Sequence, residues 1–192
     1  GISVTTGTVN TIVGGQAGDA LTEGSQNVLI GKDAGGGLTT GGQNTAVGFE
    51  ALMSEDAGYT ATAIGFRTLK TQDTGNTYNT AVGHAAGMSV TTGTQNTIIG
   101  GLAGDALTTG SYNIALGYEA LSTEDTGNKS IAIGWRALKI QDNNDDNFNV
   151  AIGHAAGQVI TTGMQNVIIG GPAGDALTTG SSNIAIGATV IA

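Results

Sequence analysis

A short apolar segment recurs along the whole chain and always ends at a glycine. The residue before that glycine is aliphatic in every copy, and the residue three before it is Thr, Val or Ile, as in Asn44-Thr45-Ala46-Val47-Gly48. The interval between closing glycines is about 17 residues, and it is longer only before Gly83 and before Gly153. Because Thr, Val and Ile favour strands, the pattern predicts one short strand in each repeating unit. The closing glycines are Gly14, Gly31, Gly48, Gly65, Gly83, Gly100, Gly117, Gly134, Gly153, Gly170 and Gly187.

A second landmark stands ten residues after each closing glycine. It is glycine in nine units, from Gly24 to Gly180, and Asn144 in one. Glycine and asparagine tolerate positive φ, so we expect the chain to turn a corner at both landmarks. The extra residues of the long units follow the second landmark, around Thr77-Tyr78 and 145–148, which predicts a loop there.

The residues between the two landmarks divide the units into two kinds. One kind has Gly four residues after the closing glycine and an aliphatic residue seven after it, as in Gly87 and Val90. The other, which we call Leu-type, has Leu at the fourth position and Glu or Gln at the seventh, as in Leu52 and Glu55. The kinds alternate in pairs, so four units make one super-repeat. We expect a single repeat array over 1–192, part of a longer fibre, with super-repeats at 14–82, 83–152 and, in part, 153–192.

These units predict an all-β fold, because none has the i, i+3, i+4, i+7 apolar spacing of a helix. One unit cannot bury its apolar residues alone, whereas stacked units can. The prediction is a parallel β-solenoid of eleven coils, each of about 17 residues, forming a rod about 50 Å long at the usual strand spacing of about 4.8 Å. A recurrent Asn four residues before the closing glycine predicts a ladder of side-chain amides along the rod. Its members are Asn10, Asn27, Asn44, Asn79, Asn96, Asn113, Asn149, Asn166 and Asn183.

The alternation of side chains along a strand predicts which positions face the core. The positions one and three before the closing glycine share one face, and the position two before it lies on the other. We expect the first pair to point inward, so that Val47→Asp would disrupt folding, and the second to point outward. That second position is never polar, and an exposed apolar stripe is typical of an association site between two or three chains. The expected oligomer interface is Ile12, Leu29, Ala46, Ala63, Ala81, Ile98, Ala115, Ala132, Ala151, Ile168 and Ala185.

Composition narrows the classes of partner. The net charge is −9 and only six residues are Lys or Arg, which argues against binding to the phosphate track of a nucleic acid. The chain has no Cys and therefore no thiolate metal site. No apolar run approaches the length of a membrane span, so we expect no membrane insertion.

The repeated string resembles a known group of proteins. Asn-Thr-Ala-Val-Gly, followed by Ala-Leu or Ala-Gly and then by Thr-Thr-Gly, is similar to the head repeats of trimeric autotransporter adhesins and to related repeats of phage tail fibres. The resemblance covers essentially the whole chain, for example 43–52, 78–87 and 108–117. It implies left-handed parallel β-rolls that form a homotrimer, located extracellularly on a bacterial surface or a virion. It also implies attachment to a host cell or surface through a glycan or protein receptor. Those adhesin heads commonly have shorter coils than the units of this chain, which favours the fibre-type relatives.

Two columns of ring-bearing side chains are candidates for glycan binding. Directly after successive closing glycines lie Phe49, Phe66 and His84, and then, one super-repeat later, Tyr118, Trp135 and His154. Exposed rings stack on sugars, but packing within the rod or between chains fits the pattern equally well and is the favoured interpretation. Neither His has a second His or a Cys near it, so we expect no metal site in these columns.

Charged residues recur at fixed positions, and the pattern favours ion pairs over a catalytic site. Stacking would place Glu50 beside Arg67 and Glu119 beside Arg136, as surface ion pairs. No nucleophile, base and orienting group converge, so the chain is predicted not to be an enzyme. Ca²⁺ is the one conceivable cofactor, held by stacked carboxylates, but no calcium-loop motif is present and a solvated face is favoured. The acidic residues concerned are Glu55, Asp56, Asp73, Glu124, Asp125, Asp142, Asp145 and Asp146.

The Thr-Thr-Gly turns suggest a different function. Rows of Thr on a solenoid can order water, so a monomeric solenoid that binds ice or another repetitive surface is an alternative to the leading prediction of an adhesive fibre segment. The row is interrupted and lies at a corner, which disfavours this alternative. A passive fibre spacer is a further alternative. The turns begin at Thr5, Thr39, Thr91, Thr108, Thr161 and Thr178.

Overall fold

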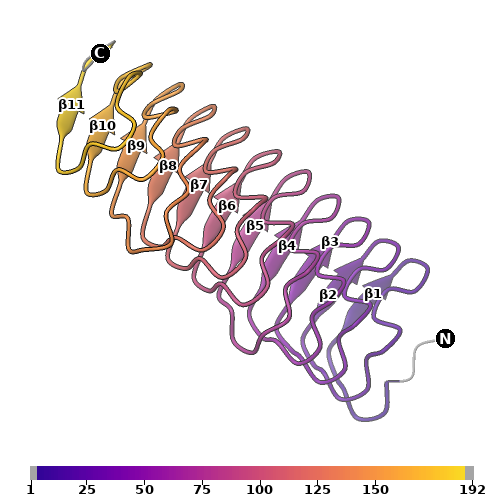
Figure 1. The fold of residues 1–192 in the computed structure, drawn as a ribbon. Helices are drawn as coiled ribbons and strands as arrows, with labels where there is room; N and C mark the ends of the chain where they lie inside the picture. The colour runs from indigo at the N-terminus through magenta and orange to yellow at the C-terminus, as the bar shows by residue number, and fades with distance from the viewer. Residues whose placement is uncertain (1–3, 189–192) are drawn as a thin grey trace.

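The chain forms a rod of stacked coils with one strand in each coil, as Figure 1 shows for the computed structural model, which describes residues 4–188. The strands run along one side of the rod, and the two ends of the chain lie at opposite ends of it. The predicted all-β parallel solenoid, with coils of about 17 residues, is therefore confirmed, and the described part contains no helix. The strands are β1 (Thr11–Val13), β2 (Val28–Ile30), β3 (Thr45–Val47), β4 (Thr62–Ile64), β5 (Thr80–Val82), β6 (Thr97–Ile99), β7 (Ile114–Leu116), β8 (Ile131–Ile133), β9 (Val150–Ile152), β10 (Val167–Ile169) and β11 (Ile184–Ile186).

The strands form one parallel sheet in the order of the sequence, from β1 to β11. Each strand meets the next at equivalent positions, as where Thr45 pairs with Thr62 and Ala46 with Ala63. The two longer units keep this register, because their extra residues lie outside the strands. Every column of the repeat is consequently a column in space along the rod. The last four residues of the third super-repeat lie outside the described residues.

The two glycine landmarks turn the chain for different reasons. All closing glycines have φ between 122° and 143°, a region that favours glycine, and a Cβ on Gly48 would collide with the carbonyl oxygen of Gly65. The corner predicted at the second landmark does not use positive φ. Gly41 has no positive φ and is required instead by close approach, because a Cβ there would collide with the carbonyl oxygen of Gly58.

The core lies between the sheet and the opposite limb of each coil, and it reverses the predicted facing of the strands. The position two before the closing glycine points inward, with side chains fully buried at Leu29, Ala46 and Ala132. The positions on either side of it point outward, and 57% of Val13 and 40% of Ile99 are exposed. Val47→Asp therefore meets the outer face and not the core.

Complementary volumes explain this orientation. Where the fourth residue after the closing glycine is Leu, as at Leu52, the strand presents Ala, here Ala46, and both are buried. Where that residue is Gly, the strand often presents a larger side chain. A Cβ on Gly18 would lie 2.7 Å from Cδ1 of Leu29. A large side chain on one side of the core is thus met by a small residue on the other.

The Asn ladder is present but binds mainly to backbone. The side-chain oxygen of Asn27 accepts from the backbone N–H of Asn44 at 3.0 Å, and its Nδ2 donates to the carbonyl oxygen of Gly41 at 3.0 Å. Both partners belong to the next coil, so each amide joins two coils at the corner. Direct amide-to-amide bonds also occur, as from Asn166 to Asn149 at 3.1 Å. These side chains satisfy buried backbone groups that would otherwise lack partners.

Candidate functional site

The outer face of the sheet is an uncharged stripe that spans all eleven strands. The position before each closing glycine is aliphatic in every strand, and the position three before it is Thr, Val or Ile. The first of these two columns, which we call the outer aliphatic column, is half-exposed or exposed throughout. Its members are Val13, Ile30, Val47, Ile64, Val82, Ile99, Leu116, Ile133, Ile152, Ile169 and Ile186.

The predicted oligomer interface is wrong in its residues, because their side chains fill the core of the single chain. Ten of them are buried at 0% exposure, and Ile12 is packed against the same core. A strand that is apolar on both faces does not itself reveal which face points inward. The residues concerned are Ile12, Leu29, Ala46, Ala63, Ala81, Ile98, Ala115, Ala132, Ala151, Ile168 and Ala185. The apolar stripe available to a partner is instead the outer aliphatic column.

The predicted aromatic columns form, and their rings lie on one another. Phe66 is stacked between Phe49, at 5.4 Å between ring centroids, and His84, at 5.1 Å. Lys32 lies over the ring of Phe49, at 5.4 Å from its centroid. A sugar needs a free ring face, and these contacts cover both faces of Phe66. Phe66 therefore offers a ligand only the edge of its ring.

The second aromatic column repeats this packing in part. Trp135 stacks on His154, with 4.6 Å between centroids, and the guanidinium carbon of Arg136 lies 4.2 Å from the Trp135 centroid. Tyr118, which is 46% exposed, belongs to no stacked pair and leans over Gly101. Glycan binding by Phe49, Phe66, His84, Tyr118, Trp135 and His154 stays a prediction.

The expected ion pairs are confirmed, and each gains a lysine. Arg67 Nε lies 2.8 Å and Lys70 Nζ 2.7 Å from the same oxygen of Glu50. Arg136 and Lys139 make the same contacts with Glu119, at 2.7 and 2.6 Å. Hydrogen bonds from the lysine and then the arginine lower the pKa of both carboxyls below the usual value. Two cations per carboxylate suit a structural role on the surface better than proton transfer.

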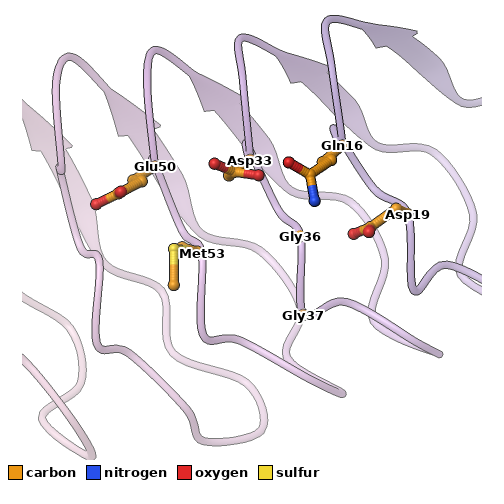
Figure 2. Close-up of a pocket in the computed structure, with 7 residues that line it drawn as sticks. All are labelled: Gln16, Asp19, Asp33, Gly36, Gly37, Glu50 and Met53. Carbon is orange, nitrogen blue, oxygen red and sulfur yellow. The ribbon is translucent and has the colours of Figure 1, made fainter.

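A shallow hollow of about 500 Å³ on the side of the rod was not predicted (Figure 2). It arises because Gly36 and Gly37 have no side chains. In the next coil, Met53 occupies the position equivalent to Gly36. Asp33 already pairs with Lys32 at 2.6 Å, and Glu50 with the cations above, so the hollow does not gather free catalytic groups. The run Gly35-Gly36-Gly37 was the signal in the sequence. The lining residues are Gln16, Asp19, Asp33, Gly36, Gly37, Glu50 and Met53.

A carboxyl group is buried inside the rod in each Leu-type pair of coils, contrary to the expected solvated face. Glu55 is 1% exposed, and Gln72 of the next coil donates to its Oε2 at 2.9 Å. The Gln72 oxygen in turn accepts from Asn79 at 2.8 Å. Ala61 replaces Asn in this coil, which leaves room for the Glu55 side chain. Burial raises the pKa of Glu55 to about 7.

The second super-repeat contains the same network with more donors. Glu124 is fully buried and accepts from Gln141 at 2.9 Å, from the backbone N–H of Gly127 at 2.8 Å and from Asn147 at 3.1 Å. Burial raises the pKa of Glu124 as well. Ser130 stands where the first super-repeat has Ala61, and its hydroxyl accepts from Gln141 at 2.8 Å. Both departures from the Asn column thus accompany a buried glutamate.

The threonines of the turns use their hydroxyls within the rod. Thr91 donates to the carbonyl oxygen of Thr108 at 3.1 Å, and Thr108 donates to that of Asp125 at 3.0 Å. Thr161 makes the same bond to Thr178 at 3.2 Å. These donors join neighbouring coils and are not directed toward an external lattice, which counts against the ice-binding alternative.

Comparison of the chain with family models, with curated proteins and with solved structures finds no match in any of the three. Among residues 4–188, no helix is long and apolar enough to cross a membrane. The function is therefore inferred from the surfaces and networks described above.

Proposed function

We propose that this chain is a structural segment of an extracellular fibre that associates as a homotrimer and takes part in attachment to a host cell or surface. A phage tail fibre or a bacterial surface adhesin would contain such a segment. In this proposal the chain has no catalytic activity and no nucleic-acid partner. The observation that carries it is the outer aliphatic column, an exposed apolar row on the uncharged and uncovered face of an eleven-stranded parallel sheet.

Parallel sheets are normally covered on both faces. At about 4.8 Å per strand, the outer face is about 50 Å long, and two columns make it about 10 Å wide, or roughly 500 Å² per chain. Two such faces reach the roughly 1,000 Å² expected of a specific interface. A second copy of the rod offers the same apolar spacing along the same length. The number three comes from the resemblance to adhesin heads and tail fibres.

The mass in solution tests association. We expect light scattering on a size-exclusion column to give three times the chain mass of 18.9 kDa. The double variant Leu116→Lys with Ile133→Lys should dissociate to a monomer that keeps its β-type circular dichroism, because both side chains lie on the outer face. A matched control, Thr123→Lys, adds charge at an exposed corner and should leave the mass unchanged.

Ala132→Lys distinguishes the two faces of the same strand. It places a charge in the core and should abolish folding. Ile133→Lys, on the outer face of the same strand, should leave the chain folded. A wild-type monomer would contradict the proposed fibre, and a folded Ala132→Lys variant would contradict the inward position.

Attachment is tested separately from assembly. A glycan array with the purified segment, and cell attachment by Trp135→Ala, test whether the aromatic columns contribute. No glycan binding together with unchanged attachment would leave a trimeric spacer as the function.

A further inference from the structure

The outer face of the sheet changes in composition along the rod. The column three residues before each closing glycine, which we call the variable column, lies beside the outer aliphatic column on this face. In strands β1 to β6 the variable column holds threonine everywhere except at β2, and in β7 to β11 it holds only isoleucine or valine. We call these parts the Thr half and the Ile/Val half. The column reads Thr11, Val28, Thr45, Thr62, Thr80, Thr97, Ile114, Ile131, Val150, Val167 and Ile184.

The threonine hydroxyls of the variable column have no hydrogen-bond partner among residues 4–188, in contrast to those of Thr91 and Thr108, which donate to carbonyl oxygens of the next coil. Thr62 and Thr80 are only half-buried, so water reaches them in the single chain. A hydroxyl that becomes covered by an apolar surface loses this water without replacement, which is unfavourable. A partner that covers the Thr half must therefore offer polar groups to it.

The Ile/Val half has no hydrogen-bonding side chain in either outer column. All of its outward side chains are half-buried or exposed, and 37% of Ile152 is exposed. Removal of such apolar surface from water favours association. The two halves of the face thus require different surroundings, polar for one and apolar for the other.

The area of the face indicates that both halves are covered together. The whole outer face measures roughly 500 Å² per chain, so two copies that meet over the Ile/Val half alone would bury only about 500 Å² in total. That area lies well below the roughly 1,000 Å² expected of a specific interface. A stable interface between copies consequently needs the Thr half as well.

Overlap along the whole face allows two orientations, and they treat the threonine hydroxyls differently. In an antiparallel pair, β4 of one copy lies opposite β8 of the other, so Thr62 faces Ile131, and Thr80 likewise faces Ile114. Each of these hydroxyls is then covered by an apolar side chain. In a parallel pair the Thr halves lie together, and their hydroxyls, which both donate and accept, can bond across the chains. The Ile/Val halves also lie together and bury apolar surface against apolar surface.

We propose that copies of this chain associate side by side in the parallel orientation, with each coil beside the same coil of its neighbours, and that the Ile/Val half supplies most of the affinity. This inference rests on the proposed association of the outer faces, and it adds the orientation and the half that drives association. Chains related by a rotation axis along the rod have equivalent coils at the same height, so a closed ring of parallel chains is also in register.

Distances between spin labels test the orientation. The chain has no Cys, so a single introduced cysteine carries the label at one known place. Gln26→Cys and Ser182→Cys are changes at exposed residues, just before β2 and β11. In a parallel oligomer, we expect pulsed dipolar EPR to give a short distance for both variants, set by the width of the assembly. In any antiparallel pair at least one of the two distances is about 43 Å or more, because the labelled coils are nine strands apart.

The same substitution in each half tests where the affinity lies. Val150→Thr replaces a half-buried outward side chain of the Ile/Val half, and we expect it to raise the concentration at which half of the oligomer dissociates by roughly tenfold. Val28→Thr, the matched control, completes the threonine column of the Thr half and should leave that concentration within about twofold of the wild type. Circular dichroism establishes that both variants are folded.

The outcomes separate this inference from the proposed fibre. A wild-type oligomer in which either label distance reaches about 43 Å would overturn the parallel orientation and leave the proposed association standing. Equal weakening by Val28→Thr and Val150→Thr would overturn the assignment of the affinity to the Ile/Val half. A wild-type monomer would contradict the proposed fibre itself, and this inference with it.

Discussion

The two Leu-type pairs of coils differ in how they accommodate a buried glutamate. Each encloses a glutamate, Glu55 in the first super-repeat and Glu124 in the second, and each connects it to a glutamine of the next coil. Glu55 receives one side-chain donor, and its Oε1 has none. Glu124 receives the same donor, a backbone N–H and the Asn147 amide.

The difference shows how a buried acid is accommodated in a stacked fold. With few donors, the carboxyl holds its proton, as the raised pKa of Glu55 indicates. Burial also raises the pKa of Glu124, and its several donors oppose that rise because they stabilise the ionised form. The Asn147 donor lies in the loop of the second pair, where the first pair has Thr77, so residues of this loop change the chemistry of the interior and not only the surface.

The largest effect should come from removing the shared glutamine. Gln72→Leu leaves the carboxyl of Glu55 without its side-chain donor and the amide of Asn79 without one of its two acceptors. We expect a loss of roughly 3 to 5 kcal/mol in the free energy of unfolding. Gln141→Leu should cost less, because Glu124 keeps two other donors. Denaturant titration of both variants measures the difference, and equal losses would contradict the comparison.

The pH dependence should follow Glu55. Its pKa is about 7 in the folded chain and near the ordinary value of 4.5 in the unfolded chain, so the folded chain binds more protons between these values. Its contribution to stability is full below pH 4.5 and is lost as the pH rises through 7, by on the order of 3 kcal/mol. Glu55→Gln, which keeps the shape without the titration, should remove this loss. If the wild type is more stable at pH 8 than at pH 5 and Glu55→Gln removes that rise, the prediction is refuted.

A smaller change in the pH dependence of stability should follow from exchanging the residues at positions 77 and 147 between the two pairs. Thr77→Asn supplies the amide that the first pair lacks, and we expect it to recover about 1 kcal/mol of stability at pH 8. Asn147→Thr is the reciprocal change and should increase the dependence of stability on pH in the second pair. Thermal unfolding at pH 5 and pH 8 measures both. If Thr77→Asn alters stability equally at the two pH values, the amide does not act on the charge of Glu55.

The smallest effects should come from the surface pairs, which are alike in both regions. Arg67→Ala and Arg136→Ala each leave the carboxylate one cation, Lys70 or Lys139. We expect the melting temperature to fall slightly and by the same amount, and to respond less to these changes in high salt. A clear difference between the two variants would mean that the outer surfaces also differ.

Much of the fold could be predicted from the sequence, because the repeat fixes the columns. The closing glycines, the aliphatic residue before each and the spacing determined the solenoid and its register. Glu50 and Arg67 could be paired for the same reason, since residues one unit apart become neighbours in space. The left-handed sense of the coil stays a prediction.

The facing of the strands could not be obtained from polarity, because all three positions of a strand such as Thr45–Val47 are free of charge. The better signal was volume. Each Leu at the fourth position, as at Leu121, occurs with Ala in the middle of the strand, here Ala115, and Ile or Leu occupies that middle position only where the fourth position is Gly. Only residues that share one closed space need to compensate in this way.

The buried glutamates were also missed, because charged residues near a corner usually lie in water. Their signal was indirect. Ala61 and Ser130 are the two departures from the Asn column, and each occurs in the coil that holds a glutamate. A break in a ladder therefore identifies the place where another side chain needs the room.

Because all strands pair in the same register, the length of the rod can change by whole super-repeats. Because every strand presents the same three positions to its neighbours, deleting or duplicating one super-repeat brings together coils that fit as the original ones did. Each such event changes the length by four coils, or roughly 19 Å. The rod can therefore be lengthened or shortened in whole super-repeats, while each ring, ion pair and buried acid keeps its position within its own coil.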